Sequence, residues 1–583
     1  MIYSKHQLSQ IITQHCKANN IKHIVISPGS RNAPLVIGFT EDPFFKCYSV
    51  VDERCAAFFA LGIAQQLQTP TVLVCTSGSA LLNYYPAISE AFYSDIPLVV
   101  LSADRPKHLI NIGDGQTIIQ KDVFKNHILY AANLKQEFSD YKDVQKSDDV
   151  PLLKSIKNTA ERFLDIQSNI NDYNSNEVYR AIRYAKTHHG PVHVNAPFEE
   201  PLYETTSQPF LLPEIDSITS NHETSHNLKH CLEVWNSSIK KLILVGVCSP
   251  NKIEKKWLEH LAKDPSVIVL TETTSNIHHN DFFSGIDQLI SGFSHEEKML
   301  FQPDILITFG GLVVSKKIKL LLRKYKPNKH WHIDPKKAND TFFCLTQHIP
   351  LEPNVFFSKI VPESTVLSST YHSIFKGIKE KRLKKHDTYL ENSPFSDFKV
   401  FHKVLKTIPE HYTLQVSNSS AIRYTQLFKL NETVRVYCNR GTSGIDGSTS
   451  TSIGCAVVTK TPTLLITGDL SFFYDSNALW NNYIPKHFRI ILINNSGGGI
   501  FRILPGNKNT SNFETYFETK HRLTAENLCQ MYHFTYQKAH NIKTIESALT
   551  SFYKLEEQPK LLEIFTPREI NDKVLLEYFN FIA

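Results

Sequence analysis

Short and nearly continuous apolar runs recur along this chain of 583 residues, and each is followed by turn residues and then by apolar residues at helical spacing. Such runs predict strands that are buried on both faces, because a strand with one exposed face alternates apolar and polar residues. Strands that alternate with helices predict an α/β fold in which parallel sheets are covered by helices. The predicted strands are 23–26, 48–51, 71–75, 98–101, 191–195, 241–247, 267–270, 305–309, 330–333, 464–466 and 490–493.

The pattern of strands and helices falls into three parts, and the chain is long enough for three domains with complete hydrophobic cores. We therefore expect α/β domains at 1–198, 199–362 and 396–583. The polar and basic stretch 363–395 predicts a solvated connecting helix.

In the last domain, the strand 464–466, a helix with its core at 478–483 and the strand 490–493 predict one βαβ unit. A right-handed crossover makes the strands parallel, so Asp469 and Asn495 both lie at the carboxyl edge of the sheet. A carboxylate, an amide oxygen and a carbonyl of the Gly-rich turn are hard donors that suit Mg²⁺ bound to phosphate. Each pair, Gly-Asp or Asn-Asn, taken alone fits an ordinary turn equally well.

In the first domain, small and polar residues follow the predicted strands. Ser30 and Arg31 lie in a Gly-Pro turn that opens a helix, and Arg105 follows a later strand at the same edge. Asp52 is a plausible N-cap, which places Glu53 in the first turn of an apolar helix, where it equally well complements the helix dipole. Thr76 to Ala80 forms a small-residue loop that allows close approach to the backbone.

The composition excludes several classes of protein. The net charge of +6 is small for this length and no basic stripe interleaved with aromatic residues occurs, so nucleic acid is not an expected partner. The ten cysteines form no Cys-x-x-Cys pair, which argues against a zinc site or a disulfide framework. No apolar run is long enough to span a bilayer, and the N-terminus lacks a signal-peptide pattern. We expect a cytoplasmic protein without membrane insertion.

Taken together, the motifs are specific. Gly468-Asp469 followed by Asn494-Asn495 resembles the diphosphate-binding signature of thiamin-diphosphate enzymes. In order along the chain, Ser-Pro-Gly-Ser-Arg, Asp-Glu-Arg, Thr-Ser-Gly-Ser-Ala, Ala-Asp-Arg-Pro and Gly-x-x-Gln-x-Ile resemble one branch of these enzymes over about residues 20–510. That branch is the 2-succinyl-5-enolpyruvyl-6-hydroxy-3-cyclohexene-1-carboxylate synthase (MenD) family.

The resemblance implies pyrimidine-binding, central and diphosphate-binding domains, with thiamin diphosphate and Mg²⁺ or Mn²⁺ as cofactors. It implies that Glu53 binds the aminopyrimidine ring of the cofactor. Ser419 and Arg423 are four positions apart, which predicts that they share one face of a helix. The implied catalytic residues are Glu53, Arg31, Gln116, Ser419, Arg423 and Arg440. The implied substrate-binding residues are Ser30, Arg105, Lys316, Lys317, Ile500 and Phe501. The implied cofactor-binding residues are Glu53, Thr76, Gly78, Gly444, Ile445, Leu470 and Ser471, and the implied metal ligands are Asp469, Asn495 and Gly497.

The implied reaction is decarboxylation of 2-oxoglutarate, followed by conjugate addition of the succinyl carbanion to isochorismate in menaquinone biosynthesis. The resemblance also implies a site shared between subunits, hence a homodimer at least, with a homotetramer as the larger alternative. Two alternatives stay open. One is another thiamin-diphosphate 2-oxo acid decarboxylase or carboligase, and the other is a catalytically silent regulator that binds a diphosphate.

Overall fold

The computed structural model describes residues 2–137, 159–210, 228–504, 506, 508 and 510–583. The chain forms two compact units. Unit 1 contains residues 1–220 together with 446–460 and 475–485, and unit 2 contains 221–445, 461–474 and 486–583.

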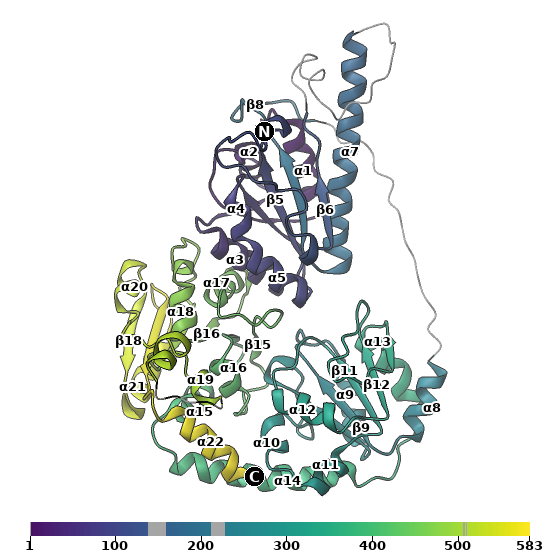
Figure 1. Cartoon of the computed structure of the whole chain (residues 1–583), viewed down its shortest axis with the longest axis vertical. Coiled ribbons are helices and arrows are strands. Elements are labelled where there is room, and N and C mark those ends of the chain that lie inside the picture. Colours follow the sequence, from purple (N-terminus) through teal and green to yellow (C-terminus); the bar gives the residue numbers. More distant parts are fainter. Residues whose placement is uncertain (1, 138–158, 211–227, 505, 507, 509) are drawn as a thin grey trace. The chain divides into compact units, whose positions relative to one another are not determined.

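Three parallel sheets, each with helices packed against it, confirm the expected α/β fold (Figure 1). The sheet of unit 1 has the strand order β3-β2-β4-β5-β7-β6, and all its neighbouring strands are parallel. Its strands are β2 (His23–Ile26), β3 (Lys46–Ser49), β4 (Thr71–Cys75), β5 (Leu98–Asp104), β6 (Tyr130–Asn133) and β7 (Val192–Pro197). A short antiparallel pair, β1 (Tyr3–Ser4) and β8 (Thr205–Thr206), lies outside this sheet.

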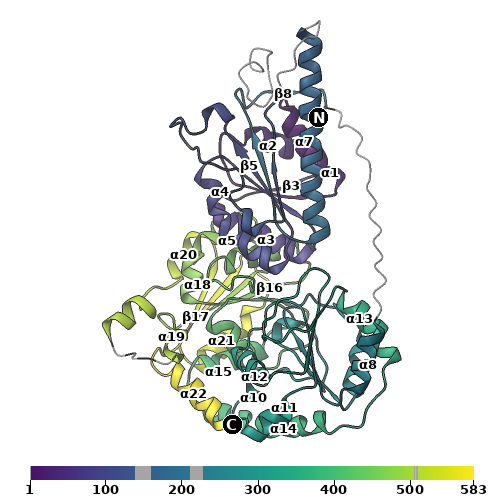
Figure 2. The same ribbon diagram turned by 45° about the vertical axis from the view of Figure 1, so that its right-hand side comes forward.

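The helices of unit 1 cover this sheet. One apolar cluster joins α1, α2 and α7 to alternate residues of the strands, and α7 runs along the sheet in both views (Figures 1 and 2). The other strand residues point the opposite way, and α3 contacts β2 and β4. The α-helices of unit 1 are α1 (Gln7–Ala18), α2 (Ala33–Thr40), α3 (Glu53–Leu67), α4 (Ser79–Asn83), α5 (Tyr85–Ser94), α7 (Thr159–His188) and α17 (Ser448–Val458). The 3₁₀ turns are η1 (Lys107–Leu109), η2 (Lys125–His127) and η5 (Ser476–Leu479).

Helices α3 and α17 pack with their backbones in close approach. A Cβ atom added to Gly62 would lie 2.0 Å from the carbonyl oxygen of Thr451, and one added to Gly454 would lie 1.9 Å from that of Phe59. Only glycine fits at both positions, because real Cβ atoms do not come so close to another backbone. These two glycines therefore set the distance between the helices.

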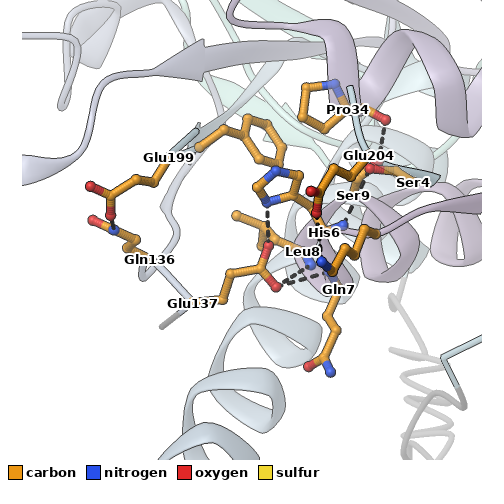
Figure 3. A network of polar contacts seen from close by, with 12 residues as sticks. Ser4, His6, Gln7, Leu8, Ser9, Pro34, Gln136, Glu137, Glu199 and Glu204 are labelled. Carbon is orange, nitrogen blue, oxygen red and sulfur yellow. Dashed lines mark hydrogen bonds and ion pairs between the residues drawn. The ribbon is translucent and has the colours of Figure 1, made fainter. Parts of the chain in front are cut away.

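A polar network joins the amino end of α1 to the segment after β7 (Figure 3). His6 Nδ1 lies 2.8 Å from Glu137 Oε1, and His6 Nε2 lies 3.0 Å from the carbonyl oxygen of Pro201. The other oxygen of Glu137 accepts a 2.8 Å hydrogen bond from the amide of Gln7. One carboxylate thus accepts from a helix amide that has no partner within α1 and also orients the histidine.

The first sheet of unit 2 has the order β10-β9-β11-β12-β13, with helices and apolar clusters on both faces. Its strands are β9 (Lys241–Val245), β10 (Val267–Leu270), β11 (Ile305–Phe309), β12 (Lys329–Ile333) and β13 (Gln347–Ile349). The accompanying helices are α8 (Lys229–Ser237), α9 (Lys255–Lys263), η3 (Thr273–Ser275), α10 (Ile286–Ile290), α11 (His295–Phe301), α12 (Lys316–Lys324), α13 (Pro353–Ile360), η4 (Val361–Glu363) and α14 (Tyr371–Asn392).

The second sheet of unit 2 has the order β15-β14-β16-β17-β19-β18 and is parallel throughout. Its strands are β14 (Thr413–Val416), β15 (Arg435–Tyr437), β16 (Thr463–Gly468), β17 (Arg489–Asn494), β18 (Thr535–Ala539) and β19 (Lys560–Phe565). The accompanying helices are α15 (Asp397–Lys406), α16 (Ser420–Thr425), α18 (Asp469–Tyr474), α19 (Ile500–Ile503), the π-helix η6 (Phe513–Phe517), α20 (Glu526–Met531), α21 (Ile542–Phe552) and α22 (Asn571–Ile582).

Two local expectations differ from the structure, and one short strand was not predicted. The crossover helix does not have its core at 478–483; α18 begins directly at Asp469, and only a 3₁₀ turn follows, at Ser476–Leu479. The Asn481 side chain accepts a 2.9 Å hydrogen bond from the amide of Tyr483, a local turn that competes with helix. Strand β3 lies two residues earlier than expected. Its register with β2 pairs Lys46 with His23. The short edge strand β13 has too few apolar residues to be recognised from sequence.

Within the part of the chain that the structure describes, no helix combines the length and the apolar character needed to cross a bilayer.

Candidate active site

The paired strands β16 and β17 bring two of the expected metal ligands to one sheet edge. Gly468 pairs with Ile493, so Asp469 and Asn495 leave the same end of neighbouring parallel strands. Asp469 Oδ2 accepts a 3.0 Å hydrogen bond from the amide of Gly497, which ties the Gly-rich turn to the carboxylate. His521 Nε2 lies 3.2 Å from the same oxygen, a contact that sequence gave no reason to expect.

The donor atoms at this edge fit a hard divalent cation. Asn495 is 8% exposed, and its Oδ1 is buried with no hydrogen-bond partner among the described residues. A buried amide oxygen without a partner is unfavourable unless a ligand meets it. The described ranges contain no cluster of three His, Cys, Asp or Glu side chains, so any metal here depends on one carboxylate, neutral oxygens and the oxygens of a bound phosphate.

A loop before α17 is bound to the start of α18. Ser471 Oγ donates a 2.6 Å hydrogen bond to the carbonyl oxygen of Ile445, and Asn418 Nδ2 donates one of 2.7 Å to that of Gly444. The Ile445 side chain is 40% exposed, so it is not part of a hydrophobic core. The amide of Leu470 donates to Asp469 Oδ1 at 2.7 Å, so it is already engaged.

Two arginines lie beside this loop. Arg440 Nη1 donates a 2.7 Å hydrogen bond to Asn418 Oδ1. Arg423 makes no hydrogen bond or ion pair with any residue that the structure describes, although its Nε is buried. Burial lowers the pKa of Arg423, and the positive charge of Arg440 lowers it further. The charges of Asp287 and Glu272 raise it, although neither carboxylate forms an ion pair with Arg423 in the described chain. The Arg423 guanidinium therefore keeps hydrogen-bond donors that suit an anion.

Ser419 is not on the helical face of Arg423, so that part of the expectation is wrong. Helix α16 begins at Ser420, and Ser419 is its N-cap with φ of 67°. This left-handed conformation is uncommon for a residue with a side chain, and such strain often occurs at functional loops.

A third cation, on α12, belongs to the same group of charges. The pKa of Lys319 is lowered by burial, raised by Glu272 and lowered again by Arg440, Arg323 and Arg423. Glu272 holds the start of α12, because its carboxylate accepts hydrogen bonds from the amides of Val314 (2.7 Å) and Ser315 (2.8 Å). Burial raises the pKa of Glu272 to about 7.

The two lysines expected to bind substrate have different surroundings. Lys316, the first residue of α12, is exposed. Lys317 Nζ donates a 2.6 Å hydrogen bond to Ser291 Oγ and lies 3.3 Å from the centre of the Phe579 ring. Burial lowers the pKa of Lys317 to about 8. Substrate binding by Lys317 therefore requires its ammonium group to leave these contacts.

The expected apolar wall follows the Gly-rich turn. Ile500 is half-buried, and Phe501 is 36% exposed. The turn before them is held by Glu518, whose carbonyl oxygen accepts a 2.6 Å hydrogen bond from the amide of Gly498. The Glu518 carboxylate is buried between Arg502 and Arg568.

In unit 1, Glu53 occupies the first position of α3, as expected. Asp52 caps the helix by accepting a 3.1 Å hydrogen bond from the amide of Cys55. Glu53 is half-buried and accepts a 3.3 Å hydrogen bond from Asn83 Nδ2. It lies near the end of β4, because its charge adds to burial in raising the pKa of the Cys75 thiol.

The loops after β2 and β4 meet at this edge. A Cβ atom on Gly29 would lie 2.3 Å from Thr76 Cβ, and one on Gly78 would lie 3.0 Å from the carbonyl oxygen of Gln116. Gly78 has φ of +87°, which favours glycine, and Gln116 has φ of 56°. Thr76 Oγ1 is buried and finds no hydrogen-bond partner in the described ranges.

Arg31 and Arg105 lie close enough to perturb each other. The pKa of Arg31 is lowered by burial and then by the charge of Arg105. Arg31 Nη1 donates a 3.0 Å hydrogen bond to the carbonyl oxygen of Phe198, and Arg105 Nη2 donates one of 2.9 Å to that of Gly115. Ser30 is exposed beside them. Unit 1 thus brings together Ser30, Arg31, Thr76, Gly78, Arg105 and Gln116.

Comparison with known proteins identifies the family. The model of the thiamine pyrophosphate enzyme N-terminal TPP binding domain matches residues 6–128. A protein of Flavobacterium psychrophilum named 2-succinyl-5-enolpyruvyl-6-hydroxy-3-cyclohexene-1-carboxylate synthase is 53% identical, over 99% of each chain. The chain belongs to this synthase family. Relatives of the same name from Christiangramia forsetii (53% identical, 100% of each chain) and Porphyromonas gingivalis (35% identical, 100% of this chain and 98% of that one) agree.

The family assignment confirms the resemblance drawn from the ordered motifs, and it makes the chain a thiamin-diphosphate enzyme. Sequence reasoning missed Lys319, Glu272, His521 and Glu518. These residues lie outside the strand-end motifs, and only their folded neighbours connect them to the site.

Proposed function

We propose that this enzyme decarboxylates 2-oxoglutarate and joins the remaining four-carbon unit to isochorismate by conjugate addition. The product is 2-succinyl-5-enolpyruvyl-6-hydroxy-3-cyclohexene-1-carboxylate, an intermediate of menaquinone biosynthesis. Both substrates are acidic. The observation that supports this choice is the unpaired Arg423 next to Arg440. Arg440 is itself connected to the Gly444–Ile445 loop by hydrogen bonds through Asn418.

We assign the cofactor and metal to the residues that fit them. Thiamin diphosphate, when bound, supplies the electron sink for the charge left by departing CO₂. Asp469, Asn495 and Gly497 would hold Mg²⁺ or Mn²⁺, and Gly444, Ile445, Leu470 and Ser471 would surround the diphosphate. Thr76 and Gly78 would face the pyrimidine ring, and Glu53 would hold a proton in hydrogen-bonding contact with that ring.

The remaining residues act on the substrates. Arg423, Arg440 and Lys316 would neutralise carboxylates, with Ser419 as an additional donor. Arg31, Arg105, Gln116 and Ser30 would do the same from unit 1. Ile500 and Phe501 would exclude water from the reacting carbon. We further propose that two chains form a homodimer in the cytoplasm and that each active site uses residues of both chains. A homotetramer would be a pair of such dimers.

The test follows the ultraviolet absorbance of isochorismate with purified protein, thiamin diphosphate and Mg²⁺, with and without 2-oxoglutarate. We expect loss of isochorismate only when all components are present, and none with Glu53→Gln. Glu177→Gln is a matched control, because Glu177 binds Tyr130 at the opposite end of the strands of unit 1.

The other outcomes identify the alternatives. Release of CO₂ from 2-oxoglutarate without consumption of isochorismate would indicate another decarboxylase or carboligase. Binding of thiamin diphosphate without any turnover would indicate a silent regulator.

A further inference from the structure

The orientation of the Asn495 amide is set by another side chain. Asn495 Nδ2 donates a 3.0 Å hydrogen bond to Asp397 Oδ2, while Asn495 Oδ1 is buried without a hydrogen-bond partner in the described chain. An ionised carboxylate has only acceptor atoms, so it must face the NH₂ group of an amide and not its oxygen. The opposite side of the amide then presents oxygen.

Asp397 is itself held in place. It is 2% exposed, at the first position of α15. Thr566 Oγ1 donates a 2.6 Å hydrogen bond to Asp397 Oδ1, and the Asp397 amide donates one of 2.8 Å to Asn571 Oδ1. Thr566 follows β19 and holds the carboxylate, and Asn571 begins α22 and holds the backbone amide of Asp397. A movement of the carboxylate with Asn495 would break its hydrogen bond with Thr566.

We propose that Asp397 is a positioning residue that turns Asn495 Oδ1 toward the divalent cation. Asp397 does not touch the metal; it excludes the amide orientation that would present Nδ2 to a cation. Partners of this kind usually determine metal affinity as well as ligand orientation. The inference rests on the metal assignment within the proposed function, and not on the identity of the substrates.

The experiment measures Mn²⁺ affinity in the presence of thiamin diphosphate by electron paramagnetic resonance of free Mn²⁺. In Asp397→Asn, an NH₂ group replaces one of the two acceptor oxygens. When the remaining oxygen keeps its hydrogen bond from Thr566, the NH₂ group faces Asn495. Asn495 then turns in response and presents Nδ2 to the cation. We expect Mn²⁺ affinity to fall about 10- to 100-fold.

Asp264→Asn is the matched control. Asp264 is a buried carboxylate of unit 2 that accepts hydrogen bonds from the Ser266 amide (2.9 Å) and hydroxyl (2.5 Å), at the other parallel sheet. We expect Mn²⁺ affinity to be unchanged in this variant. If Asp397→Asn does not fold, Thr566→Val is the second variant to measure. It removes one of the contacts that fix the carboxylate, and its Mn²⁺ affinity should also be weaker.

Unchanged Mn²⁺ affinity in both folded Asp397→Asn and folded Thr566→Val would overturn the proposal. A wild-type protein that binds no Mn²⁺ together with thiamin diphosphate would overturn it too. Failure of the proposed reaction appears separately, as Mn²⁺ binding that depends on Asp397 in a protein that does not consume isochorismate.

Discussion

At the scale of single residues, His6 has two hydrogen-bond acceptors. They are the Glu137 carboxylate at 2.8 Å (Figure 3) and the Pro201 carbonyl at 3.0 Å. A neutral imidazole has one N–H group, so only the doubly protonated ring donates to both. Burial lowers the pKa of His6, but the hydrogen bond and charge of Glu137 and the Pro201 carbonyl outweigh it, and the net shift is upward.

This shift predicts a pH-dependent contribution to stability. Because the pKa of His6 is raised on folding, the contribution is complete below the unfolded value, about pH 6.5, and is lost as pH rises through the folded pKa. We expect His6→Ala to lower the free energy of unfolding by about 1.5–3 kcal/mol near pH 5.5 and by less near pH 9, measured by urea denaturation. Glu137→Gln should remove most of this pH-dependent contribution of His6 to the free energy of unfolding. Equal losses at both pH values would contradict this account.

The lysines of α12 give a second prediction. Lys319 lies among the charges of Glu272, Arg440 and Arg423, whereas Lys317 contacts Ser291 and Phe579. We expect Lys319→Met to raise KM for one of the two acidic substrates about 10- to 100-fold, as for a lost charge-assisted hydrogen bond. Lys317→Met should mainly lower the melting temperature, because a buried cation–π contact is worth about 2 kcal/mol. The reverse pattern would place Lys317 in the substrate site.

At the scale of elements, the contact between α3 and α17 positions Glu53, which begins α3. Gly62→Ala puts a methyl group where the Thr451 carbonyl lies, so the helices must separate. We expect the free energy of unfolding to fall by about 1–3 kcal/mol, measured by chemical denaturation. Gly377→Ala, in α14, is the control, because nothing lies within 4 Å of its added Cβ. This control should be stabilised by about 0.5–1 kcal/mol. A neutral Gly62→Ala would show that the two helices adapt freely.

At the scale of the whole molecule, a site shared between two chains predicts complementation. Glu53→Gln and Asp469→Asn should each be inactive alone. After random reassembly of equal amounts, about half of the dimers are heterodimers. Each heterodimer contains one site with both changes and one with neither, so about one quarter of wild-type activity should return. Each variant reassembled with itself is the control. No recovery in heterodimers isolated through a different affinity tag on each chain would show that each site is built from one chain.

The sequence by itself determined the strands that are buried on both faces, because short and continuous apolar runs are compatible with few other structures. It also determined the Asp52 cap before Glu53 and the placement of Asp469 and Asn495 at one sheet edge, since neighbouring parallel strands end together. The ordered motifs were sufficient to identify the family.

Only the tertiary structure decided the features that depend on distant residues. Asn481 ended the expected crossover helix by a local hydrogen bond that competes with helix formation. The orientation of Asn495 depends on Asp397, 98 positions earlier, and the spacing of α3 and α17 on glycines far apart in the chain. Periodicity reports which face of an element is buried, but not which residue of another element it meets. That choice is made by packing, hydrogen bonding and charge in the folded protein.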